Sequence, residues 1–228
     1  MAMHARIFGT LLLAVALSQC NNYDLLDKLE SPGISASGSK ETFTSNNYIF
    51  VSSWLTAGDM MAAPFPECAA FNGMPRADCA CTRSAASRGL RKSSSHSFIA
   101  WLSATGNDAL CRLQGLATPC SPSGSSPYFN TLGQQVAASV GDFGVNNLSA
   151  PIQYDESGNG AGSNLAWTGT SSTGSHSGTS CTDWSIASAG PNATVGDRTA
   201  PGGSAAWTNT GTNQGCDTSQ RVYCVARP

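Results

Sequence analysis

Nine cysteines constrain the fold of this chain more than any other feature, and they divide into one and eight. Cys20 closes an apolar N-terminal segment. The other eight lie downstream of it: Cys68, Cys79, Cys81, Cys111, Cys120, Cys181, Cys216 and Cys224. An even set of cysteines behind a secretory segment is typical of a disulfide framework in an oxidising compartment. The sequence therefore predicts an exported domain that is stapled by disulfides.

Residues 1–19 have the pattern of a bacterial lipoprotein signal peptide. Arg6 precedes an apolar run, residues 7–17, that is too short to span a bilayer. The lipobox-like sequence Leu-Ser-Gln-Cys ends at Cys20. Gln19 departs from the usual small residue, and spirochaete lipoproteins tolerate such a departure. We expect acyl chains, palmitate among them, on Cys20, which would anchor the chain to a membrane. The alternative is an ordinary cleaved signal in which Cys20 has no special role.

The charge balance argues against a nucleic-acid partner. The chain has 12 Lys and Arg against 14 Asp and Glu, a net charge of −2, whereas nucleic-acid binding needs a basic surface. Charged residues make up 11% of the chain, well below the usual quarter. Small polar residues are expected to cover the surface instead.

The chain divides into a signal peptide (1–19), a flexible tether (20–46) that begins at the lipidated Cys20, and one domain (47–228). Within the domain we expect a strand at 48–51 and a helix from Cys79 to about Arg88, with Asp78 as its N-cap and Gly89 as its stop. Residues 98–102 are apolar and predict a strand or the end of a helix. Further short apolar segments predict short antiparallel strands; they lie at 134–138, 150–154, 165–167, 181–186, 205–207 and 222–225.

An ordered set of motifs resembles one known domain family. Residues 77–90, ADCACTRSAASRGL, followed by 98–103, FIAWLS, resemble the A-D-x-x-C-x-x-x-A-x-x-x-G-L … F-x-A-F-L-S signature of the endostatin domain. The later motifs W-x-G at 167–169, C-x-x-W at 181–184 and V-Y-C-V at 222–225 follow in the endostatin order. With the lipobox, this pattern is similar to that of the leptospiral endostatin-like outer-membrane lipoproteins. The resemblance implies an α+β, C-type lectin-like fold with short antiparallel strands, one or two helices and long loops.

The resemblance also implies the disulfides Cys81–Cys224 and Cys181–Cys216. Closeness in sequence favours Cys68–Cys79 and Cys111–Cys120 for the remaining four, although sequence alone leaves their pairing open. A metal site at 79–81 is disfavoured because no second short-spaced pair with histidines accompanies it. No metal and no cofactor are expected.

The resemblance implies a function in binding at the outer membrane and cell surface. Members of the family bind host extracellular-matrix proteins and complement regulators, so we expect an adhesin-like protein that is not an enzyme. One alternative is an envelope lipoprotein that holds a bacterial partner or a glycan. The other is an extracytoplasmic hydrolase, in which His96 or His176 would be the catalytic histidine. The sequence has no G-x-S-x-G motif to supply a nucleophilic serine beside them.

The expected binding face is the loop at 185–215, with Asp197, Arg198 and Trp207 as its candidate ligand contacts. Such a loop is the usual ligand-binding segment of lectin-type folds. The sugar-binding triplets of calcium-dependent lectins, E-P-N or Q-P-D and W-N-D, do not occur in this sequence. Calcium-dependent sugar binding is therefore disfavoured. The plain alternative for the loop is a solvated connection without a ligand.

Overall fold

The computed structural model describes residues 43–162 and 165–228. Its fold consists of short strands arranged around one central strand, together with a few helices. The strands are β1 (Asn47–Val51), β2 (Phe98–Ala100), β3 (Tyr128–Phe129), β4 (Gln135–Ala137), β5 (Leu165–Trp167), β6 (Asn192–Asp197), β7 (Asn213–Gly215) and β8 (Arg221–Ala226). The α-helices are α1 (Gly73–Ser87), α2 (Ala109–Gln114), α3 (Val140–Val145) and α4 (Cys181–Trp184), with 3₁₀ turns η2 (Pro66–Ala70) and η3 (Ala205–Trp207). This confirms the predicted α+β class.

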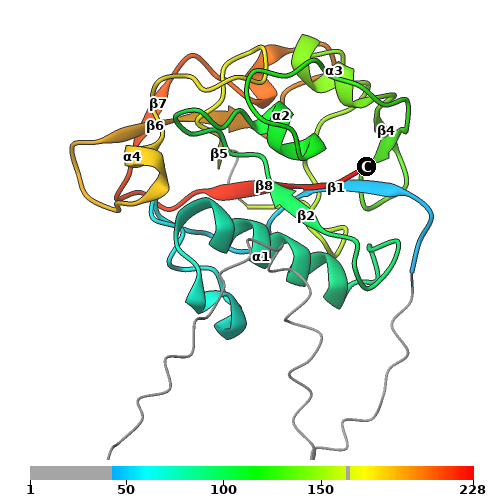
Figure 1. The fold of residues 1–228 in the computed structure, drawn as a ribbon, viewed down its shortest axis with the longest axis horizontal. Coiled ribbons are helices and arrows are strands. Elements are labelled where there is room, and N and C mark those ends of the chain that lie inside the picture. The colour runs from blue at the N-terminus through cyan, green and yellow to red at the C-terminus, as the bar shows by residue number, and fades with distance from the viewer. Residues whose placement is uncertain (1–42, 163–164) are drawn as a thin grey trace, which may run out of the picture. The chain divides into compact units, whose positions relative to one another are not determined.

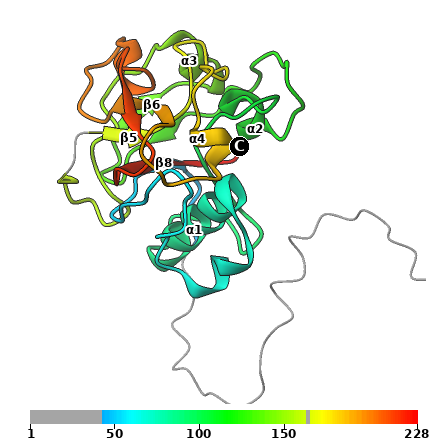
Figure 2. The same cartoon turned by 90° about the vertical axis from the view of Figure 1, so that its left-hand side faces the viewer.

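Strand β8 organises the sheet, whose order is β4-β3-β1-β8-β5-β6-β7 with β2 also paired to β8. Phe50 of β1 and Ala100 of β2 both lie opposite Cys224, so β8 is paired on both edges at that point. Two of the pairings, β1 with β3 and β5 with β8, are parallel, which corrects the expectation of antiparallel strands throughout. Figures 1 and 2 show α1 on one side of β8 and the pair α2 and α3 on the other.

The hydrophobic core is rich in aromatic rings. Trp101, Trp167, Trp184 and Trp207 are each at most 1% exposed. The ring of Trp101 lies 5.1 Å from that of Trp207 and 5.5 Å from that of Phe143, measured between centroids. The indole N–H of Trp101 donates to Thr208 Oγ1 at 2.9 Å. The core therefore joins strand and loop segments that are far apart in sequence.

Four disulfides connect the described cysteines, and all four predicted pairs are confirmed. Their members are Cys68–Cys79, Cys81–Cys224, Cys111–Cys120 and Cys181–Cys216. The second of them ties α1 to the central strand across 143 residues of sequence. The fourth joins the start of α4 to the segment just after β7.

Helix α1 begins at Gly73, earlier than the predicted start at Cys79. Pro75 lies in the first turn of the helix, where a backbone N–H has no intrahelical partner and its absence costs little. The role of Asp78 as N-cap is therefore wrong. Asp78 lies inside the helix, where its carboxylate accepts from the Ala100 N–H at 2.9 Å and binds Arg112 at 2.6 Å.

The predicted end of α1 is confirmed. Gly89 adopts φ +65°, which a residue with a side chain rarely adopts. The N–H groups of Gly89 and Leu90 donate to the carbonyls of Ala86 and Ala85. This pair of bonds is the Schellman arrangement that ends many helices.

Several of the expected short strands take other forms. Residues 150–154 contain only an isolated bridge at Tyr154, residues 181–184 form the helical turn α4, and residues 205–207 form η3. Conversely, β6 and β7 lie within the segment that was expected to be one long loop. Strand β6 passes so close to η3 that a Cβ on Gly196 would lie 1.9 Å from the Trp207 carbonyl oxygen. Only glycine allows this close approach of the two segments, and no local sequence pattern predicts it.

The predicted signal peptide, the lipidated Cys20 and most of the predicted tether lie outside the described residues. The described residues all belong to a unit of residues Glu41–Pro228. At its start, the Thr44 N–H already donates to the Arg91 carbonyl at 2.9 Å. Within this unit, none of the described helices combines the length and the apolar character needed to cross a bilayer.

Candidate binding site

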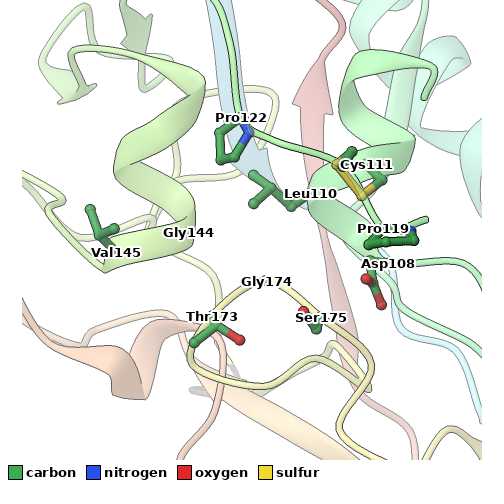
Figure 3. Close-up of a pocket in the computed structure, with 11 residues that line it drawn as sticks. Asp108, Leu110, Cys111, Pro119, Pro122, Gly144, Val145, Thr173, Gly174 and Ser175 are labelled. Atoms are coloured by element: carbon green, nitrogen blue, oxygen red, sulfur yellow. A yellow bond between two sulfur atoms is a disulfide. The ribbon is translucent and has the colours of Figure 1, made fainter. Parts of the chain in front are cut away.

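A cleft of about 200 Å³ lies between α2, α3 and the loop at 173–175. Its walls are largely apolar: Leu110, Pro119, Pro122, Val145 and the Cys111–Cys120 disulfide. Figure 3 shows Val145 and Asp108 on opposite sides of the cleft, with Leu110 between them. Small-molecule sites usually measure about 300–1,000 Å³, so this cleft suits one side chain better than a whole cofactor.

Two glycines bring the walls of the cleft close to Leu110. A Cβ on Gly144 would lie 2.9 Å from Leu110 Cδ2, and one on Gly174 would lie 2.9 Å from Leu110 Cβ. Gly174 also has φ +83°. The Leu110 N–H donates to the Gly174 carbonyl at 3.3 Å, which fixes the loop against α2. The cleft is thus part of the packed scaffold.

Asp108 supplies the charge of the cleft. It is the N-cap residue of α2, yet its side chain makes no capping hydrogen bond. One carboxylate oxygen, Oδ1, instead accepts from the His176 N–H at 2.8 Å. The backbone N–H of Asp108 donates to Thr118 Oγ1 at 2.9 Å, which holds it beside Pro119. The half-buried carboxylate is therefore positioned by two different loops.

Next to this cleft, α4 forms a left-handed helical turn. The φ angles of its four residues lie between +51° and +64°, a conformation that costs about 1–2 kcal/mol per residue for L-amino acids. The turn is held by the Cys181–Cys216 disulfide and by Trp184, whose buried indole N–H donates to the Ser103 carbonyl at 2.8 Å. Since the conformation is unfavourable by itself, these anchors determine where its polar side chains lie.

The turn gathers a histidine, a serine and an aspartate. His176 Nε2 lies 3.1 Å from Ser180 Oγ, and the same Oγ lies 3.0 Å from Asp183 Oδ1. In a hydrolase triad the carboxylate binds the histidine; here Asp183 binds Ser180 and accepts two bonds from Thr105. The hydrogen bond from the Thr105 N–H lowers the pKa of Asp183, and the bond from Ser180 and the charge of His176 act in the same direction. Ser180 is only 6% exposed, so the cluster serves to fasten the turn.

His96, the other histidine named in the sequence, joins a loop to the C-terminus. Its Nδ1 accepts from the Lys92 N–H at 3.1 Å, and its Nε2 lies 2.9 Å from the Arg227 carbonyl oxygen. Because a carbonyl can only accept, Nε2 carries the hydrogen and the ring is neutral. Burial lowers the pKa of His96, as do the charges of Lys92 and Arg91, while the bond to Arg227 opposes this effect.

We expect the free energy of unfolding to fall as the pH drops below the ordinary histidine pKa of about 6.5. Below that value the unfolded chain binds a proton at His96 that the folded chain resists, because burial disfavours the charged ring and the charges of Lys92 and Arg91 repel it. Protonation would also turn Nδ1 from an acceptor into a donor that faces the backbone N–H of Lys92. This contribution is complete above pH ~6.5. Thermal unfolding at pH about 7.5 and about 5.5 measures it in wild type and in His96→Gln. Equal pH dependence in the two proteins would contradict the prediction.

The three candidate ligand residues of the predicted loop have different environments. Trp207 is 1% exposed and packs on Trp101, so its expected role as an exposed contact is wrong. Arg198 is 8% exposed and its Nη1 donates to the Gln153 carbonyl. Asp197, half-buried at the end of β6, accepts from Thr199. The structure does not join these residues into an exposed ligand surface.

Sequence reasoning did not single out Asp108, Leu110 or Val145. The 72% exposure of the apolar Val145 at the end of α3 is a property of the fold, and no local sequence pattern predicts it. Among the residues that the structure describes, no group of three or more His, Cys, Asp and Glu side chains is arranged to hold a metal ion.

Neither a known protein-family model nor a curated protein matches this sequence.

Proposed function

We propose that this chain is an exported binding protein with an endostatin-like, C-type lectin-like domain. Its ligands are macromolecules, such as host extracellular-matrix or complement-regulatory proteins, and its role is adhesin-like. The four disulfides support export, because such cross-links persist in oxidising compartments. Acyl chains on Cys20 would hold the protein at the outer membrane, facing the cell surface.

The cleft beside Asp108 is the observation that carries this proposal. It has apolar walls, one carboxylate and the size of a single side chain, which are the features of a pocket that receives an anchor residue from a partner protein. Its walls belong to a disulfide-bonded scaffold, so the pocket is formed before binding and little ordering cost arises.

We infer that the domain acts by binding and not by catalysis, and without a cofactor. The polar side chains nearest to a catalytic pattern have structural roles: Asp183 and Ser180 fasten the left-handed turn, and both ring nitrogens of His96 hold backbone groups. Turnover of a generic ester, peptide or glycan substrate that is lost in Ser180→Ala or His176→Ala would refute this inference.

Solid-phase binding tests the proposed function. The full chain, purified with its disulfides oxidised, is expected to bind at least one matrix or serum protein saturably. The same protein after reduction and alkylation is the control and should lose that binding. If no matrix or complement protein binds the oxidised chain saturably, the adhesin-like function is wrong.

Protease treatment of intact cells tests where the domain lies. A domain at the cell surface is expected to be digested. Protection of the domain in intact cells, and its digestion after the outer membrane is permeabilised, would contradict the surface location and favour an envelope protein that holds a bacterial partner or glycan.

A further inference from the structure

The chemistry of the cleft specifies the kind of side chain that it can receive. Among the described residues that line it, Asp108 is the only ionisable one, since both of its cysteines are joined in a disulfide. Oδ1 of Asp108 accepts from the His176 N–H, whereas Oδ2 has no hydrogen-bond partner among the described residues. The cleft therefore has one free acceptor with a negative charge.

The remaining walls suit an aliphatic chain. Leu110, Pro119, Pro122 and Val145 present carbon atoms along the cleft, with Val145 on the side opposite Asp108 (Figure 3). Lysine and arginine bury an aliphatic stem against apolar surface and place their charge at its end. An apolar passage with a carboxylate at one side is complementary to such a side chain in both shape and charge.

We propose that the cleft binds a cationic side chain with an aliphatic stem, lysine or arginine, presented by the partner protein. This inference rests on the proposed function and names the chemistry of its anchor residue. The stem lies along Leu110 and Val145, and the cationic head donates to Asp108 Oδ2. A hydrogen bond between ionised groups in a half-buried site is stronger than one between neutral groups.

Three small probes test the inference on the full oxidised chain: the Nα-acetyl methylamides of lysine, arginine and norleucine. Norleucine has the same aliphatic character and no charge. We expect the lysine or the arginine probe to bind about tenfold more tightly than the norleucine probe, which corresponds to one charge-assisted hydrogen bond. Amide NMR signals of Val145, Gly174 and Ser175 should shift on binding. Equal binding of all three probes, or no shift at these residues, would overturn the inference.

Asp108→Asn is the main variant, because asparagine keeps the acceptor for the His176 N–H and removes the charge. It is expected to reduce binding of the cationic probe to the norleucine level. Asp59→Asn is the matched control: Asp59 is also half-buried and also accepts one backbone N–H, from Met61 at 3.0 Å. The control should bind as wild type does. Unchanged binding in Asp108→Asn would overturn the inference.

Val145→Lys keeps the test valid if Asp108→Asn fails to fold. Val145 is 72% exposed, so the substitution is tolerated, and it places a positive charge at the cleft. It should weaken binding of the cationic probe more than binding of the norleucine probe, because the added charge repels only the cationic head. Equal weakening of both probes would overturn the inference. If a matrix or serum protein binds wild type and Asp108→Asn equally well, the proposed function stands and the role of this cleft is refuted.

Discussion

Replacing Cys81 and Cys224 together by alanine is expected to lower the free energy of unfolding by about 5 kcal/mol, because the disulfide between them closes a loop across 143 residues. In the chain-entropy relation, the longer the closed loop, the more the cross-link restricts the unfolded chain. Both side chains are also fully buried between α1 and β8, so removing their sulfur atoms leaves a gap in the core and destabilises the fold further. Since domains are stable by about 5–15 kcal/mol, we expect the variant to unfold in low urea or not to fold.

The Cys111–Cys120 pair is the matched control, because it spans only 9 residues of sequence. The same relation gives about 3 kcal/mol for its removal by a double alanine substitution. Urea unfolding of the oxidised proteins measures both changes. If the long-range pair contributes no more than the short one, the disulfide does not act by joining the ends of the domain.

The parts of the fold that sequence predicted are those with a local signal. Gly89 ends α1 because the required φ is positive, and a glycine after a helical segment predicts this. The strands β1, β5 and β8 are compact apolar runs, and their predicted positions are confirmed. The disulfide pairs are the exception: the two long-range pairs were expected from the resemblance, and only the two short-range pairs from closeness in sequence.

The errors share one cause, which is that tertiary contacts outweigh local preference. The segment 181–184 has a strand-like composition, but the Cys181–Cys216 disulfide and the buried Trp184 hold it in a left-handed turn. Asp78 is a residue type that often caps helices, but its carboxylate accepts hydrogen bonds from the Ala100 N–H and from the Arg112 guanidinium, which belong to other elements. No window of sequence around these residues contains their partners.

The candidate cleft could not be predicted for a similar reason. Its walls come from four separate stretches of the chain, and its shape depends on Gly144 and Gly174, whose missing side chains allow the approach to Leu110. The predicted site failed where it required Trp207 to be exposed. A tryptophan in a Gly- and Thr-rich segment has no local feature that distinguishes a core position from a surface position, and here its carbonyl lies against Gly196 of β6.

Trp101→Ala is expected to lower the free energy of unfolding by about 3–5 kcal/mol, the usual range for a buried tryptophan. Trp101 is fully buried, and its ring contacts those of Phe143 and Trp207 at centroid distances of 5.5 and 5.1 Å. Its N–H is also bonded to Thr208 Oγ1. The substitution thus leaves a cavity between α3 and η3 and removes a buried hydrogen bond, which costs further free energy.

Two further variants separate these effects in urea unfolding. Trp101→Phe retains an aromatic ring and loses the hydrogen bond to Thr208, so it should lower the free energy of unfolding less than Trp101→Ala does. Leu132→Ala removes an apolar side chain that is 60% exposed and should change the stability by no more than about 0.5 kcal/mol. A loss in Trp101→Ala as small as that in Leu132→Ala would mean that the aromatic cluster does not hold α3 and η3 against the sheet. The walls of the cleft, of which the end of α3 is one, would then lack the rigid support on which a preformed binding site depends.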